Sequence, residues 1–389
     1  MIIGIPKEIM VGEARVSATP ETVKKFVQDG MTVLVQAGAG VKSLFSDDSY
    51  REAGAQIIDN SKDLFGKSDL ILKVKEPQFN DEIGLHEIDI MRKNQYLITF
   101  LHPASPNNHK MINHLAESGV IGLTLDGVPR ISRAQSMDAL TSMSTCAGYK
   151  GMLMAADELA LFMPQMFTAV GVLKPANVLV IGAGVAGLQA LATAKRLGAV
   201  TYAIDIRPAA AEQAKSLGAK IIDTGVPSEC AVGDGGYALK LSNEWLEVER
   251  KIISEIIKEM DIVFCSALIP GKVAPILITE DMVKIMKSGS VIMDVSIDQG
   301  GNCEITPAGK KEKIHSVTIE GVKNIPGLIP SSSTWMFALN MYNLVKYLVK
   351  DNRISLDMEG VFVRSMLVTY DNEVVHEGAK EAMEILLEV

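Results

Sequence analysis

The sequence has few cysteines and no excess of basic residues. Its four cysteines, Cys146, Cys230, Cys265 and Cys303, are scattered over 389 residues and form no C-x-x-C pair. A disulfide framework and a zinc site are therefore not expected, and the pattern favours a reducing compartment. The formal net charge of −9 excludes the basic footprint that nucleic-acid binding needs.

Long hydrophobic runs are also missing. The most apolar stretch, "LALFMPQMFTAVGVL" at 159–173, is interrupted by Pro164 and Gln165 and is short for a membrane span. The chain begins "MIIGIPKE", which is typical of a strand rather than of a signal peptide. We therefore expect a soluble, cytoplasmic protein. The length favours two domains, and the apolar content of 48% suffices for large cores.

Short apolar runs alternate with helical stretches along the first 140 residues. Strands are predicted for "MTVLVQAGAG", "SDLILKVKEP", "NQYLITFLHP" and "VIGLTLDGV", with helices such as "PETVKKFVQDG" and "NNHKMINHLAESG" between them. After a long helical run from about 141, the same alternation resumes with "ANVLVIGAG", "AVTYAIDIR", "AKIIDTG", "MDIVFCSALIPG" and "GSVIMDVSIDQGG". Such alternation indicates parallel sheets covered by helices.

The sequence thus predicts an α/β protein with two doubly wound, Rossmann-like domains and a cleft between them. A second helical run, at 333–351, precedes a tail of short strands and a helix that is expected to return to the first domain. The predicted boundaries are 1–142 plus 329–389 for a discontinuous N-terminal, substrate-side domain and 143–328 for the inserted domain. The two long helical runs are expected to join the domains.

The inserted domain carries a dinucleotide-binding fingerprint. In "VLVIGAGVAGLQALATAKRLGA" at 178–199, an apolar strand leads into Gly182, Gly184 and Gly187, and a helix follows. These glycines permit a tight turn, a close approach to the pyrophosphate and close packing of helix on strand. Asp205 ends the next strand and is placed to accept the ribose hydroxyls, so NAD(H) is favoured over NADP(H). Arg207 weakens this preference slightly, because an arginine can bind a phosphate.

Two polar segments have alternative interpretations. The glycine-rich "GVPSECAVGDGGYALKLS" at 225–242 is either a plain surface loop or a lid in which Tyr237 closes over a ligand. In "PRISRAQSMDAL" at 129–140, Ser136 and Asp138 either cap the following helix, while the arginines form surface ion pairs, or the segment binds a ligand. A hydride donor must be held by such directional bonds, because hydride transfer needs close, aligned carbons.

Motifs along almost the whole chain resemble one family. In order, "PRISRAQSMDAL", "AGYKG", "VLVIGAGVAGLQALATAKRLGA", "GDGGYA", "ALIPGK" and "GGNCE" look like the NAD(H)-binding soluble alpha subunit of proton-translocating NAD(P) transhydrogenase. The opening "MIIGIPKEIMVGEARVSATPE" and the closing "VRSMLVTYDNEVVHEGA" also fit. Alanine dehydrogenase belongs to the same superfamily. "RISRAQSMDAL" and "GDGGYA" favour the transhydrogenase branch.

The resemblance implies a set of NAD(H) contacts. Arg130, Gln135 and Asp138 would orient the dihydronicotinamide, with Thr141 at a position that usually holds a serine. Tyr237 would belong to a mobile loop that closes on the nucleotide. The further contacts that the resemblance implies are Val185, Ala186, Ile206, Arg207, Ala267 and Leu268.

Four residues match the substrate-handling positions of alanine dehydrogenase: Arg15, Lys75, His102 and Asp298. Arg15 and Lys75 could bind the carboxylate and carbonyl of an amino acid or oxo acid. His102 could transfer the proton, and Asp298 could orient His102 or a water molecule. Each residue alone is also explained by an ordinary structural role. All four together could also be retained by common descent without activity.

The leading hypothesis is a transhydrogenase alpha subunit that passes hydride from NADH to a partner bearing NADP. The runner-up is an NAD-dependent alanine dehydrogenase, and a third possibility is an NAD(H)-sensing binding protein. The resemblance implies NADP(H)-binding and membrane subunits on other polypeptides, with this chain at the inner face of the membrane. It also implies a homodimer or larger oligomer, and the apolar segment 159–173 is either a contact surface for it or a segment buried within the monomer. The remaining histidines show no metal-ligand spacing, so no metal is expected.

Overall fold

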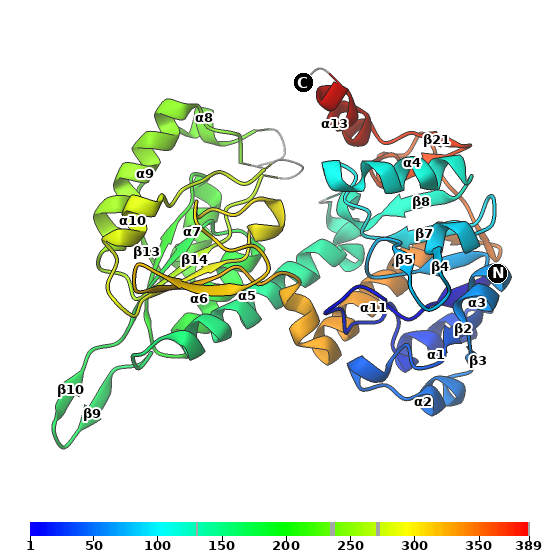
Figure 1. Ribbon diagram of the computed structural model, residues 1–389, viewed down its shortest axis with the longest axis horizontal. Helices are drawn as coiled ribbons and strands as arrows, with labels where there is room; N and C mark the ends of the chain where they lie inside the picture. The colour runs from blue at the N-terminus through cyan, green and yellow to red at the C-terminus, as the bar shows by residue number, and fades with distance from the viewer. Residues whose placement is uncertain (130, 234–237, 270–272, 388–389) are drawn as a thin grey trace. The chain divides into compact units, whose positions relative to one another are not determined.

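The structure is a computed structural model that describes residues 1–129, 131–233, 238–269 and 273–387 (Figure 1). The chain divides into two compact units. Unit 1 comprises 1–143 and 327–389, and unit 2 comprises 144–326. Helix α5 (Ala139–Glu158) begins in unit 1 and continues into unit 2.

Unit 1 contains a mixed sheet with strand order β21-β20-β8-β7-β4-β1-β2-β3. Neighbouring strands from β8 to β3 are parallel, and β20 and β21 add an antiparallel edge. The strands are β1 (Ile2–Ile5), β2 (Thr32–Gln36), β3 (Gln56–Ile58), β4 (Leu70–Leu72), β7 (Tyr96–Thr99), β8 (Ile121–Thr124), β20 (Leu367–Tyr370) and β21 (Glu373–Val374). The helices are α1 (Pro20–Gln28), α2 (Asp47–Glu52), α3 (Ser61–Lys67), α4 (His109–Glu117), α11 (Pro330–Leu348), α12 (Val361–Met366) and α13 (Glu377–Leu387). Two small ladders, β5 (Phe79–Asn80) with β6 (Leu85–His86) and β18 (Val349–Lys350) with β19 (Arg353–Ile354), lie outside the sheet.

The direction of the chain reverses across the sheet of unit 1 between β1 and β4. Ile3 of β1 is paired with Val33 of β2 on one side and with Leu70 of β4 on the other. In doubly wound folds, ligands bind beyond the carboxyl ends of the strands at such a switch point. The segments that follow β1, β4, β7 and β8 are therefore the place in unit 1 to look for a site.

Unit 2 contains a sheet of order β13-β12-β11-β14-β15-β17-β16, which is parallel except for the edge strand β16. The strands are β11 (Asn177–Ile181), β12 (Val200–Ile204), β13 (Lys220–Ile221), β14 (Ile262–Cys265), β15 (Val291–Asp294), β16 (Lys311–Ile314) and β17 (Val317–Glu320). The helices are α6 (Val185–Arg196), α7 (Pro208–Ser216), α8 (Ser228–Ala231), α9 (Asn243–Ile257) and α10 (Glu280–Lys284). Here the switch point lies between β11 and β14.

Alternate residues of β11 bury against opposite faces of this sheet. Val178 and Val180 pack in a core with residues of α5 and α6, whereas Leu179 and Ile181 pack in a second core with residues of α9. A strand covered on both faces needs a continuous apolar sequence. This requirement explains why "NVLVI" shows no alternation with polar residues.

The predicted fold class of two doubly wound, Rossmann-like domains is confirmed, but one detail differs from the prediction. Helix α11 lies wholly in unit 1 and joins no domains, because Pro330 occupies its first turn and the return crossing passes through the 3₁₀ helix Ile325–Leu328. The apolar segment near 160–173 forms an antiparallel hairpin, β9 (Met166–Thr168) and β10 (Gly171–Leu173), which projects from the rest of unit 2 (Figure 1). None of the helices in the described part of the chain is long and apolar enough to cross a lipid bilayer.

Candidate functional site

Three glycines shape the turn between β11 and α6. Gly182 has a φ of +88°, and a Cβ there would lie 2.6 Å from the backbone nitrogen of Ala267. A Cβ on Gly187 would lie 2.0 Å from the carbonyl oxygen of Gly182. Gly184 differs, because its ideal Cβ has nothing within 4 Å. The first and third glycines are thus required by packing, whereas the space beside Gly184 leaves the backbone open to another molecule.

The N-terminus of α6 faces this open space. Gly184 is the N-cap residue, and no side chain among the described residues caps the helix. The first N–H groups of a helix, here those of Val185 and Ala186, have no partner within the helix and carry partial positive charge. Both residues are half-buried. Such an end is suited to bind an anion such as a pyrophosphate.

Asp205 follows β12 and is bonded to the glycine turn. The N–H of Ala183 donates to its Oδ2 at 2.8 Å, so the carboxylate and the turn are held together. Arg207 donates from its backbone nitrogen (2.8 Å) and Nε (3.0 Å) to Oδ1 and from Nη2 (2.8 Å) to Oδ2. These bonds raise the pKa of Arg207, and the Asp205 side chain is only 4% exposed. The guanidinium that could bind a 2′-phosphate is therefore engaged by Asp205.

A second acid, Glu249 of α9, lies in the field of Asp205. It precedes Ile253 by one helical turn, and Ile253 packs in the core that contains the β11 residue Ile181. Burial and, next, the negative charge of Asp205 raise the pKa of Glu249 to about 7. A proton on Glu249 reduces the negative charge beside Asp205. The sequence motifs did not single out this residue, although an acid on the apolar face of a helix was a usable signal.

The end of β14, the other neighbour of β11, is fixed by a buried polar network. Asn302 accepts the N–H of Ala267 at 2.9 Å and donates to its carbonyl oxygen at 2.9 Å. Fully buried Asp294 in turn accepts the backbone N–H groups of Asn302 (2.9 Å) and Cys303 (3.0 Å). The network positions Ala267 beside the glycine turn. Of the other implied contacts here, Leu268 is exposed and Ile206 is half-buried.

The polar segment before α5 forms the 3₁₀ helix η5 (Ser132–Met137) of unit 1. Gln135 is exposed, whereas Asp138 is half-buried. Asp138 accepts the backbone N–H of Thr141 at 2.8 Å and its hydroxyl at 2.6 Å, which is the geometry of a cap at the start of α5. The capping role considered from the sequence is therefore present, and it leaves lone pairs of the carboxylate available to a ligand. Arg130 and Tyr237 lie outside the described residues.

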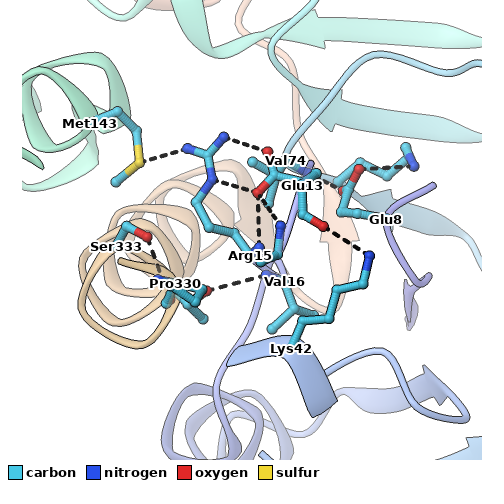
Figure 2. Close-up of polar contacts among 12 residues, drawn as sticks. Glu8, Glu13, Arg15, Val16, Lys42, Val74, Met143, Pro330 and Ser333 are labelled. Carbon is cyan, nitrogen blue, oxygen red and sulfur yellow. Dashed lines mark hydrogen bonds and ion pairs between the residues drawn. The ribbon is translucent and has the colours of Figure 1, made fainter. Parts of the chain in front are cut away.

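Arg15 lies in the segment after β1 and forms a buried pair with Glu13 (Figure 2). Its Nε and Nη2 donate to the two carboxylate oxygens of Glu13 at 2.8 and 2.6 Å, and Nη1 contacts the sulfur of Met143 at 2.9 Å. Burial alone would raise the pKa of Glu13, but the bonds from Arg15 outweigh it and lower that pKa to about 2. Arg15 is thus held in one orientation by a partner only two residues away.

His102 follows β7 and is bonded to Asp126, which follows the neighbouring strand β8. Nδ1 lies 2.8 Å from Oδ1 of Asp126, and the backbone N–H of His102 donates to Oδ2 at 2.8 Å. Burial opposes a charged imidazole, but the Asp126 carboxylate outweighs this effect and raises the pKa of His102. The backbone of His102 is left-handed (φ +47°), a strain that these two bonds help to hold. The side chain remains 42% exposed, so it can reach a ligand.

Lys75 follows β4 and lies electrostatically close to both other groups. Its charge lowers the pKa of Glu13 and opposes the charged form of His102. Among the described residues, no carboxylate lies within ion-pair distance of its ammonium group. The strand end before it is anchored by buried Glu8, which accepts the N–H of Val74 at 2.6 Å. Arg15, Lys75 and His102 therefore share the carboxyl edge of the unit 1 sheet.

Asp298 is placed differently from these three residues. It is exposed in a 3₁₀ helix (Ile297–Gln299) after β15 of unit 2. The carboxylate that contacts His102 is instead Asp126, which the sequence motifs did not single out. The sequence indicated two strands, one ending at His102 and one reaching Asp126, but not that these strands are neighbours in the sheet. Within the described residues, no cluster of three or more His, Cys, Asp or Glu side chains is arranged to hold a metal.

Known protein families account for nearly all of this chain. Residues 4–147 match the N-terminal domain described as alanine dehydrogenase/PNT, and residues 151–377 match the corresponding C-terminal domain. The chain belongs to the alanine dehydrogenase/PNT family. The resemblance inferred from the motifs is confirmed, and this family consists of oxidoreductases.

Similar members of the alanine dehydrogenase/PNT family match most or nearly all of this chain. NAD(P) transhydrogenase subunit alpha of Haemophilus influenzae is 41% identical over 376 residues, which cover 96% of this chain and 71% of that one. Alanine dehydrogenase of Staphylococcus saprophyticus is 33% identical over 398 residues, covering 99% and 97%. The crystal structure of transhydrogenase from Sinorhizobium meliloti matches with a TM-score of 0.82 and 36% identity, covering 97% of this chain and 99% of that one.

Proposed function

We propose that this chain is the NAD(H)-binding alpha subunit of an NAD(P) transhydrogenase, which passes hydride between NAD(H) and an NADP(H)-bearing partner subunit. The observation that carries the proposal is Asp205, bonded to the turn at the N-terminus of α6, where no described side chain caps the helix. Sequence identity supports the reaction class. This chain is 41% identical to the transhydrogenase alpha subunit of Haemophilus influenzae and 33% identical to the alanine dehydrogenase of Staphylococcus saprophyticus.

In this proposal the described residues have distinct roles toward NAD(H). Asp205 accepts the adenosine ribose hydroxyls, and the N–H groups of Val185 and Ala186 bind the pyrophosphate beside Gly184. Gln135 and Asp138 hold the carboxamide of the nicotinamide, with Thr141 keeping Asp138 in place. Bound NADH supplies the hydride. The protein contributes alignment of the ring, because hydride transfer requires donor and acceptor carbons in close, directed contact.

A second candidate function is NAD-dependent oxidative deamination of alanine. The observation that favours it is the shared location of Arg15, Lys75 and His102 at the carboxyl edge of the unit 1 sheet. Arg15 and Lys75 offer cations for a carboxylate, and His102, oriented by Asp126, offers a base. Against it, Arg15 already has a bidentate partner in Glu13. Asp298 of unit 2 is the remaining residue of this hypothesis.

One pair of assays separates the two functions. The purified chain with NAD⁺ and L-alanine is expected to give no NADH, whereas addition of a purified NADP(H)-binding subunit of a transhydrogenase is expected to give hydride transfer from NADH. Reduction of NAD⁺ by alanine with the chain alone would overturn the transhydrogenase proposal. In that case Lys75→Ala should abolish the reaction and leave NADH binding nearly intact. Tight NADH binding without activity in either assay would favour a sensor.

The partners in this proposal are NADP(H)-binding and membrane subunits on other polypeptides. The names of the similar proteins support it, because a protein named as subunit alpha is one piece of a larger assembly. We place this chain in the cytoplasm at the inner face of the membrane, bound through those partners. Co-purification with the membrane fraction only when the partner subunits are expressed tests this placement.

The β9–β10 hairpin supports a further element of the proposal, a homodimer or larger oligomer. Phe167 and Val170 are 76% and 99% exposed, and their exposed apolar neighbours are Leu161, Phe162, Val172 and Leu173. Several large apolar side chains exposed within one short segment are typical of an interaction surface. We expect Phe167→Asp to shift the mass in solution from an oligomer to a monomer. A wild-type monomer, or an unchanged mass for the variant, would contradict the hairpin contact.

A further inference from the structure

Two asparagines of α11 bind the same carbonyl group in η5. Nδ2 of Asn340 donates to the carbonyl oxygen of Ser136 at 3.0 Å, and Nδ2 of Asn343 donates to the same oxygen at 3.1 Å. Ser136 lies between Gln135 and Asp138, the two described residues that the proposed function assigns to the nicotinamide. The side chains therefore act on the backbone at the centre of that segment.

The rest of η5 is also anchored to unit 1. Ala134 and Met137 are buried on either side of exposed Gln135. Asp138 is fixed by both the backbone and the hydroxyl of Thr141. The carbonyl of Ser136 accepts two further bonds. The segment is therefore anchored at Ala134, at Ser136 and at Met137–Asp138, on both sides of Gln135. A six-residue 3₁₀ helix has weak internal hydrogen bonds, so such external anchors set its conformation.

One polar atom of Asn340 takes no part in the contact with Ser136. Because its amide nitrogen must face the carbonyl of Ser136, its Oδ1 points the other way, where it is buried without a hydrogen-bond partner among the described residues. An unsatisfied buried acceptor costs about 1–3 kcal/mol, which is comparable to or larger than the gain from one neutral hydrogen bond. Replacing Asn340 by an apolar residue therefore removes this cost together with the bond to Ser136.

We propose that Asn340 and Asn343 are positioning residues that hold η5 so that Gln135 and Asp138 meet the nicotinamide ring of NAD(H). This inference rests on the proposed function and adds two residues that do not touch the cofactor. The two asparagines are expected to affect binding of the nicotinamide half of NAD(H) only. They contact Ser136 of unit 1, whereas Asp205, the proposed adenosine contact, belongs to unit 2.

The test compares NADH with ADP-ribose, which lacks the nicotinamide. In the double variant Asn340→Leu, Asn343→Leu, ADP-ribose affinity is expected to stay within about twofold of wild type. NADH affinity is expected to fall by up to about thirtyfold, which corresponds to about 2 kcal/mol from the two bonds that order η5. The fluorescence of bound NADH should shift towards that of free NADH. Thermal unfolding should change by only a few degrees, because removal of the unpaired Oδ1 offsets part of the lost bonding.

Tyr342→Phe is the matched control. Tyr342 lies between the two asparagines in sequence, but its hydroxyl donates to Asp29 at 2.8 Å, away from η5. This variant loses the bonds of the hydroxyl to Asp29 and Lys346 from the same turn of α11 and should bind NADH as wild type does. Asn340→Asp adds a second readout. Its carboxylate repels the Ser136 carbonyl at pH 8, and because burial beside that carbonyl raises the pKa of the new carboxyl group, its protonated form can donate again at pH 5. Its NADH affinity relative to wild type should therefore recover on acidification.

Three outcomes would overturn the inference. One is an unchanged ratio of NADH to ADP-ribose affinity in the double variant. The second is a parallel loss of both affinities, and the third is the same loss in Tyr342→Phe, since both indicate a general structural role. Failure of the proposed function itself is distinguishable in the wild-type protein. That protein would then either bind neither NADH nor ADP-ribose, or bind NADH without passing hydride to the NADP(H)-binding subunit.

Discussion

Gly184→Ala is expected to weaken NADH binding by about a hundredfold or more and to leave thermal unfolding unchanged. The φ of Gly184 is −75°, which alanine adopts without strain, and nothing lies within 4 Å of the added Cβ. The protein therefore has room for the methyl group, but in the proposed function the pyrophosphate approaches the backbone at this point. A steric block of a phosphate that is held by helix N–H groups removes several charge-assisted bonds, each worth about 1.5–3 kcal/mol.

Gly187→Ala is the matched control because it adds the same methyl group to another glycine of the same motif. Its Cβ would lie 2.0 Å from the carbonyl oxygen of Gly182, so the β11–α6 turn must shift. We expect a lower unfolding temperature together with weaker binding. Calorimetric unfolding and NADH titration of both variants separate the two cases. A Gly184→Ala protein that binds NADH normally would show that the open space beside the backbone is not the pyrophosphate site.

The glycine turn could be predicted because its signals lie close together in the sequence. The spacing of Gly182, Gly184 and Gly187, the preceding apolar strand and Asp205 after the next strand all belong to one β-α-β unit. Local geometry follows from local sequence in such a unit. The confirmed fold class has the same origin, since the alternation of strands and helices limits the possible topologies strongly.

The bond between His102 and Asp126 could not be predicted in the same way. It depends on β7 and β8 being neighbours in the sheet, and no sequence spacing specifies which strands pair. The β9–β10 hairpin shows a related limit. Hydrophobicity marked 159–173 as either a buried segment or a contact surface, but composition does not reveal whether side chains such as Phe167 are covered. The pair formed by Arg15 and Glu13 was within reach, because the two residues are only two positions apart.

Asp205→Asn is expected to reduce the preference of the protein for NADH over NADPH. The amide keeps the shape of the carboxylate and can still accept the N–H of Ala183, so the turn should persist. It loses the charge that strengthens the bonds to the ribose hydroxyls, which should weaken NADH binding by about tenfold to a hundredfold. Arg207, now released from its ion pair, gains the freedom to bind a 2′-phosphate.

The measurement is the ratio of NADPH to NADH dissociation constants, which should fall by a factor of about a hundred in Asp205→Asn. Arg207→Ala is the control, since it removes the cation and keeps the carboxylate, and it should bind NADH well and NADPH poorly. Asp205→Asn combined with Arg207→Ala should weaken NADH without gaining NADPH. Equal losses for both nucleotides in Asp205→Asn, with a lower unfolding temperature, would mean that the carboxylate serves only to anchor Ala183 and contacts no ribose. If the ratio falls as expected, the charge of Asp205 sets the cofactor preference, together with the Arg207 guanidinium that it binds.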